Sequence, residues 1–137
     1  MNLRDARLEQ HDYASVSVRE ALGGEKVGCT LYEIDDGTQL WPYHFHWNNE
    51  EWLLVVDGAP TLRTPEGERE LRAGDLVSFP EGEPGAHTLL GPGRVAIFST
   101  RNQGAVEYPD SGKVGWGPPW KRLYFPVDKA VDYWEGE

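Results

Sequence analysis

Two histidines and a glutamate stand at spacings that could place them around one metal ion. His44 and His46 are separated by one residue in an aromatic-rich segment that predicts a β-strand. Because side chains alternate between the two faces of a strand, both imidazoles should leave the same face. Glu51 begins the next predicted strand, beyond a Trp47-Asn48-Asn49 connection that is typical of a turn. If the two strands pair, the carboxylate can approach both imidazoles.

His87 could add a third imidazole from a distant part of the chain. It starts another predicted strand, directly after the loop formed by residues 80–86. Three neutral imidazoles and one carboxylate suit a divalent transition metal: Zn, Fe, Mn, Ni, Co or Cu. Such a set leaves one or two coordination positions open, as catalytic sites do and structural zinc sites do not. The alternative is that the histidines are ordinary strand residues and Glu51 is a solvated strand start.

The elements that must position these residues are predicted to be short strands separated by turns. Sixteen Gly, ten Pro and six Trp among 137 residues favour many turns and strands over helices. Strands are predicted over residues 15–19, 27–34, 38–47, 51–57, 61–64, 68–72, 75–79, 87–90 and 94–100. Short strands at this spacing favour an all-β sandwich or barrel. Residues 103–137 are more irregular and predict an arm that lies on the barrel or on a partner subunit.

The segments around the four candidate ligands resemble the two motifs of the cupin superfamily. Residues 37–58 read G-x6-HFH-x4-E-x6-G, in the order of the first motif, and residues 74–87 read G-x5-PEG-x4-H, in the order of the second. Six rather than five residues precede the first histidine, and four rather than two precede the last, so two loops are longer than in the general pattern. The two motifs occur in the order that the family requires.

The resemblance implies an all-β fold, the double-stranded β-helix or jelly-roll barrel of small single-domain cupins. One domain would span 1–137, with the barrel over about 15–100 and an irregular C-terminal arm over about 103–137. Glu50 is an alternative to Glu51, which is preferred because it alone leaves six residues before Gly58. Matched position by position, the metal ligands of the family fall on His44, His46, Glu51 and His87.

The strand that carries the two histidines also presents aromatic residues at the alternate positions. These residues are Trp41, Tyr43, Phe45 and Trp47, and alternation predicts that they point out of the barrel. Trp52, Leu54 and Val56 extend this outer face on the next strand. A large exposed apolar face marks an interface, so something should cover it. The candidates are a second subunit, which predicts a homodimer, and four aromatic residues of the arm: Trp116, Trp120, Tyr124 and Phe125.

The inward positions beyond the candidate ligands are mainly aliphatic. Leu53 and Val55 follow Glu51 on the inner face of its strand, and Leu40 and Leu89 are expected to join them. Such a pocket suits a small, largely apolar or aromatic ligand that offers oxygen atoms to a metal. The one cysteine, Cys29, is expected to be a buried structural residue.

Composition and charge exclude several classes of function. With 23 acidic and 13 basic residues the net charge is −10, which disfavours contact with nucleic-acid phosphates. No segment approaches the ~20 apolar residues of a membrane span. The first ten residues are charged, which predicts a cytoplasmic location. The sequence therefore predicts a metal-binding enzyme of dioxygenase, isomerase or decarboxylase type that acts on a small molecule. The alternative is a cupin that binds a small molecule without turnover.

Overall fold

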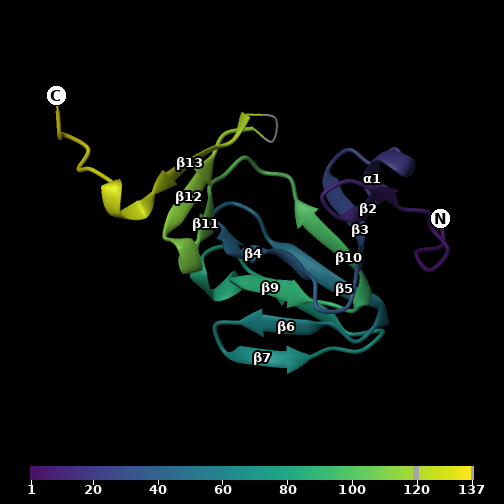
Figure 1. Cartoon of the computed structure of the whole chain (residues 1–137). Coiled ribbons are helices and arrows are strands. Elements are labelled where there is room, and N and C mark those ends of the chain that lie inside the picture. The colour runs from purple at the N-terminus through teal and green to yellow at the C-terminus, as the bar shows by residue number, and fades with distance from the viewer. Residues whose placement is uncertain (119–120, 137) are drawn as a thin grey trace.

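The computed structural model describes residues 1–118 and 121–136, and these form two antiparallel β-sheets packed face to face (Figure 1). The first sheet has the strand order β1-β2-β3-β10-β5-β8, with bounds Glu9–Gln10, Ala14–Ser17, Val27–Ile34, Gly93–Thr100, Glu51–Gly58 and Leu76–Phe79. The second has the order β13-β12-β11-β4-β9-β6-β7, with bounds Leu123–Pro126, Lys113–Trp116, Val106–Tyr108, Gln39–His46, His87–Leu90, Thr61–Thr64 and Gly67–Glu70. This arrangement is a jelly-roll barrel, which confirms the predicted fold class.

Among the described residues, helical structure is confined to short segments. The α-helix α1 spans Val18–Ala21, and 3-10 turns cover Glu83–Gly85 (η1), Pro109–Ser111 (η2) and Val127–Lys129 (η4). Ser17 caps α1, because its hydroxyl accepts a hydrogen bond from the Glu20 amide. Within the described part of the chain, none of these helices has the length and hydropathy that a membrane crossing requires.

The main core lies between the two sheets and contains the predicted inward residues. Leu53 and Val55 of β5 are fully buried, and so are Leu40 of β4 and Leu89 of β9. They pack with Ile34, Leu62, Leu71, Phe79, Val95 and Ile97 in one cluster. The period-two alternation of the strands therefore places the aliphatic residues inside the barrel, as the sequence predicts.

A second cluster lies on the outer face of the first sheet. Val56 packs there with Val18, Cys29, Leu31 and Ala96, and Leu54 joins them from the same strand. The N-terminal segment covers this face through Leu3, Ala6 and Leu8. The sequence prediction assigned this role to the C-terminal arm or to a second subunit. The N-terminal segment covers this face instead, although its short, charged sequence has no periodic apolar pattern that would predict such packing.

The C-terminal arm continues the second sheet. β11 pairs with the histidine strand β4, β12 pairs with β11, and β13 forms the edge. Figure 1 shows the chain leaving β13 and extending away from the barrel. Trp116, Tyr124 and Phe125 stay about half or more exposed, so they do not form the expected cover of the aromatic face. Trp120, the fourth expected cover residue, lies outside the described residues.

Candidate metal site

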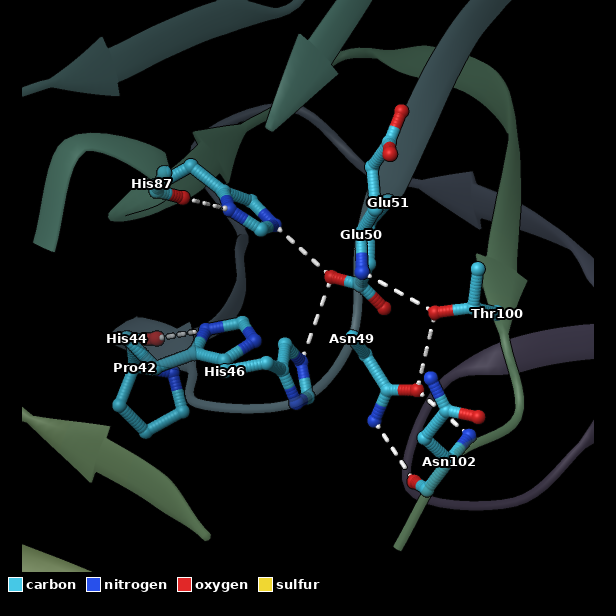
Figure 2. A network of polar contacts seen from close by, with 10 residues as sticks. Pro42, His44, His46, Asn49, Glu50, Glu51, His87, Thr100 and Asn102 are labelled. Atoms are coloured by element: carbon cyan, nitrogen blue, oxygen red, sulfur yellow. Dashed lines mark hydrogen bonds and ion pairs between the residues drawn. The ribbon is translucent and has the colours of Figure 1, made fainter. Parts of the chain in front are cut away.

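The four candidate ligands meet at one end of the barrel, on three strands. His44 and His46 lie on β4, Glu51 begins β5 and His87 begins β9. His44 is the register partner of His87 in the antiparallel β4–β9 pair, which brings the two distant motifs side by side. Figure 2 shows the three imidazoles and the carboxylate around a common space.

The distances define a compact group. Ligand atoms of His44, His46 and Glu51 all lie within 4.8 Å of one another. A Glu51 carboxylate oxygen lies 3.3 Å from Nε2 of His46 and 3.5 Å from Nε2 of His87. His87 is thus adjacent to the carboxylate, although it does not belong to the tight group of three. Glu51 is the acid that faces the histidines, whereas Glu50 is exposed and accepts a hydrogen bond from the Trp52 indole.

Backbone carbonyls orient two of the imidazoles. Nδ1 of His44 lies 2.9 Å from the Pro42 carbonyl oxygen, and Nδ1 of His87 lies 2.9 Å from that of Gly85. A carbonyl oxygen can only accept, so each Nδ1 carries the proton and each Nε2 keeps its lone pair. This second hydrogen bond, which fixes the tautomer and the ring orientation, is typical of metal-bound histidine.

The chain around His87 is folded tightly to make this contact. The η1 turn ends at Gly85, where a Cβ atom would lie 1.8 Å from the Pro80 carbonyl oxygen. Only glycine fits so close to the Pro80 backbone. The absence of a side chain lets the turn reach β9 with the Gly85 carbonyl beside the His87 imidazole. Phe79 stacks parallel on the His87 ring at 3.7 Å between centroids, which fixes the ring from one side.

Burial leaves one nitrogen of the site without a hydrogen bond. His87 is 1% exposed, and its Nε2 has no hydrogen-bond partner among the described residues. A buried polar atom without a partner costs about 1–3 kcal/mol, so such atoms usually serve a ligand. The donor set is also the one that first-row divalent metals prefer, two or three imidazoles and a carboxylate. The residues therefore fit a metal ion.

The electrostatics keep the site ready to bind a cation near neutral pH. Burial, assisted by the nearby His87 and His46, lowers the pKa of His44 to about 4. Burial also lowers the pKa of His87. For Glu51 burial alone would raise the pKa, but its hydrogen bond to His46 and its Coulombic interactions with His46, His87 and His44 lower it on balance. At pH 7 the buried pair of imidazoles is neutral and the carboxylate is ionised, as metal ligation requires.

Trp41 lies inside the barrel, so the prediction that it faces outward is wrong. Its backbone has φ +59°, a left-handed conformation that is rare for a bulky residue, and the β4–β9 register shifts between Leu40 and His44. This irregularity turns the indole inward, edge-on to the rings of His44 and His87. Hydrogen bonds hold the strained segment in place, including one from the Thr88 hydroxyl to the Trp41 carbonyl at 2.8 Å.

The other aromatic residues of β4 do lie on the face opposite to the histidines. Tyr43 and Phe45 are buried in a separate cluster with Ala86, and the Arg63 guanidinium covers the Tyr43 ring at 4.1 Å. Trp47 is half exposed, and its indole donates to the Glu107 carboxylate. The chain's own side chains therefore cover most of this face.

A network of asparagine side chains fixes the connection between the two ligand strands. The Asn49 side-chain oxygen accepts from the Thr100 hydroxyl at 3.1 Å and from the Asn102 amide at 2.8 Å, and its nitrogen donates to the Asn102 carbonyl at 3.0 Å (Figure 2). Asn102 in turn donates to the Asn48 carbonyl. The network ties the turn before Glu51 to the end of β10, and so holds the carboxylate beside His46.

A cavity of about 300 Å³ opens on His44, His46 and Glu51. We call it the inner chamber. Besides Trp41, its wall includes Tyr32, Tyr108 and Arg122, none of which the sequence analysis assigned to the site. Burial raises the pKa of both tyrosines, so their phenols stay protonated and can donate to a ligand oxygen. Arg122 comes from the C-terminal arm, where no spacing relative to the motifs could have revealed its position.

Comparison with known proteins agrees with this geometry. The sequence profile of the family described as Cupin domain matches residues 30–100, more than half of the chain. The chain belongs to the cupin family. In this cupin the matched segment contains all four candidate ligands, while Arg122 and Tyr108 lie beyond it.

Solved structures show the same fold at low sequence identity. A candidate sugar phosphate isomerase from Acidithiobacillus ferrooxidans superposes with a TM-score of 0.79 and 24% identity, covering 88% of this cupin and 80% of that chain. A cupin-superfamily sugar phosphate isomerase from Silicibacter pomeroyi gives 0.78 and 23%, covering 85% and 78%. The polyketide cyclase RemF from Streptomyces resistomycificus gives 0.59 and 18%, covering 73% and 77%. At these identities the likeness establishes the fold alone.

One curated relative is similar over most of the chain. It is the protein named nitrile hydratase subunit beta from a Rhodococcus species, 29% identical over 126 residues that cover 81% of this cupin and 53% of the relative. The cupin therefore spans about half the length of that relative.

Proposed function

We propose that this cupin is a metal-dependent enzyme that acts on a small oxygen-bearing molecule in the inner chamber. One divalent transition metal would be held by the four candidate ligands, His44, His46, Glu51 and His87. The observation that carries the proposal is the His87 ring. Its Nδ1 donates to the Gly85 carbonyl, and its buried Nε2 has no hydrogen-bond partner in the described part of the chain and lies 3.5 Å from Glu51. When bound, such a metal supplies Lewis-acid chemistry or, if it is redox-active, electron transfer.

Residues around the candidate ligands have supporting roles. Phe79 and Trp41 pack against the imidazoles, which excludes water from the back of the site. Tyr32 and Tyr108 can donate hydrogen bonds to substrate oxygens, because burial keeps both phenols protonated. Burial raises the pKa of the Cys29 thiol, which favours a structural role for this cysteine over a nucleophilic one.

Isomerisation is the reaction class to test first. The two fold neighbours with TM-scores of 0.79 and 0.78 carry the names of sugar phosphate isomerases, one of them a candidate. The volume of the inner chamber, about 300 Å³, lies at the lower end of the range for small-molecule pockets, which suits a compact substrate. Dioxygenase and decarboxylase chemistry, the other classes that the sequence indicates, would require the same metal ligands.

Elemental analysis of untagged protein measures whether a metal is bound and which one it is. Substitutions of the neighbouring Glu51 and Glu50 then serve as test and matched control. Glu51→Gln should lower metal affinity at least as much as the ~10–100-fold that loss of an outer-shell partner costs. Glu50→Gln should leave the metal content unchanged, because Glu50 faces away from the histidines. Full metal content in Glu51→Gln, or an equal loss in both variants, would contradict the assignment.

Turnover is measured separately, by proton NMR of aldoses and ketoses incubated with the metal-loaded protein. Interconversion by wild type and Glu50→Gln, with none by Glu51→Gln, is the expected result. A saturable ligand without any turnover, in protein that retains its metal, would show instead that this is a non-catalytic binding cupin.

A further inference from the structure

A second cavity lies next to the inner chamber, and the metal site accounts for only one of its wall residues, His46. This outer chamber has a volume of about 510 Å³ and shares two wall residues, His46 and Arg122, with the inner one. Its other polar wall residues are Asn49, Arg101, Asn102 and Gln103. Since the same two side chains border both cavities, one extended molecule could reach from the histidines into the outer chamber.

The charge of the outer chamber is opposite to that of the protein. The chain has 23 acidic and 13 basic residues, yet the described wall of the outer chamber contains two arginines and no carboxylate. A concave surface lined by one sign of charge concentrates ions of the other sign. The outer chamber is therefore a local site for an anion on a protein whose overall surface repels anions.

Arg122 has an unused donor at the junction of the two chambers. Its Nε is buried and has no hydrogen-bond partner among the described residues. A guanidinium presents a planar fork of donors that matches the oxygens of phosphate and carboxylate groups. Arg101 lies on the same wall, and one of its terminal nitrogens donates to the Glu25 carbonyl at 2.8 Å, which holds the side chain in place. Two guanidinium groups from separate segments thus border one space.

We propose that Arg122 and Arg101 bind an anionic group, phosphate or carboxylate, of the substrate whose reacting oxygens face the inner chamber. The amide side chains of the outer chamber add uncharged donors for the same oxygens. The link between this site and catalysis rests on the proposed function, whereas anion binding by the two arginines needs no metal. It also gives the C-terminal arm a role, because Arg122, which directly precedes β13, forms part of the wall of both chambers.

The test is calorimetric titration of the full chain with inorganic phosphate and, separately, with malonate. Loss of a charge-assisted hydrogen bond costs about 1.5–3 kcal/mol, so Arg122→Gln should weaken binding about 10–100-fold. Arg101→Gln should also weaken it. Arg72→Gln is the matched control, because the Arg72 side chain is 90% exposed and lies on neither chamber wall; it should bind as wild type does. The preferred anion distinguishes a phosphorylated from a carboxylated substrate.

Two further measurements keep the result unambiguous. Arg122→Lys retains the charge without the fork and should give intermediate affinity, while circular dichroism checks that each variant folds. Chelator-treated wild type should still bind the anion, because the anion site needs no metal. If the protein bound phosphate but never a metal, the proposed function would be refuted while the anion site would still be supported. The anion site is refuted if neither anion binds wild type, or if both arginine variants bind as tightly as wild type does.

Discussion

Acidification should destabilise the metal-free protein, and His44 should account for a large part of the loss. The pKa of this imidazole is about 4 in the folded protein, because burial opposes its charge, and 6.5 when unfolding returns it to water. Between these values the unfolded chain binds a proton that the folded chain does not. The stability contributed by neutral His44 is therefore complete above pH 6.5 and is lost as the pH falls toward 4.

The magnitude follows from the two pKa values. One pKa unit is worth about 1.4 kcal/mol, so the full loss is about 3 kcal/mol below pH 4, and about 2 kcal/mol is already lost between pH 7 and pH 5. His87 adds to the loss in the same direction, since burial lowers its pKa as well. Against a typical total stability of about 5–15 kcal/mol, this is a large effect.

Urea unfolding of chelator-treated protein at pH 7 and pH 5 measures this loss. His44→Gln cannot titrate, so the pH-dependent loss in this variant should be about 2 kcal/mol smaller than in wild type. His11→Gln is the control, because His11 is exposed, lies between β1 and β2 and does not line the inner chamber, so this variant should behave as wild type. Equal losses in wild type and His44→Gln would refute the conclusion that His44 is held neutral by burial. An NMR titration of the His44 ring with a midpoint near 6.5 would do the same.

Three other outcomes are expected. Asn49→Ala removes three hydrogen bonds at the turn before Glu51. It should lower the free energy of unfolding in urea by about 2 kcal/mol and weaken metal binding. If the variant kept wild-type metal affinity, the network would not position the carboxylate. Leu53→Ala, at a fully buried core position, should cost about 2–5 kcal/mol in the same assay, and a cost below 1 kcal/mol would contradict the described packing. The homodimer stays a prediction, and its expected interface is the exposed edge strand β13, where Phe125 is 49% exposed. Light scattering should give twice the 15.4 kDa mass, and Phe125→Glu should shift the protein toward the monomer. A monomeric wild type would exclude the dimer.

Periodicity and spacing predict the barrel from the sequence. Three strands, Val27–Ile34, Thr61–Thr64 and His87–Leu90, have the predicted bounds, and the other six predicted strands differ by at most a few residues. The strands β1, β11, β12 and β13 are not predicted, and the last three belong to the arm, which reads as irregular in the sequence. Because strand side chains alternate, the same pattern also placed Leu53 and Val55 in the core and the two histidines of β4 on one face.

Trp41 shows where local reasoning fails. Alternation predicts an outward indole, but a residue in the left-handed conformation breaks the period. Hydrogen bonds with Tyr13 and Thr88, which are distant in the chain, help to hold that conformation. The packing of the N-terminal segment on the first sheet is also not predictable from local sequence patterns. Scattered leucines and alanines acquire a common face only after the segment has docked.

The sequence by itself determined the chemistry of this cupin: which imidazoles and which carboxylate can meet, and on which strands. The choice of Glu51 over Glu50 came from a gap in a motif, and the structure agrees in the direction of the side chain. Only the tertiary structure decided what surrounds those groups. Arg122 and Tyr108 reach the inner chamber because β11, β12 and β13 add to the histidine strand, and pairing between strands far apart in the chain leaves no local trace in the sequence.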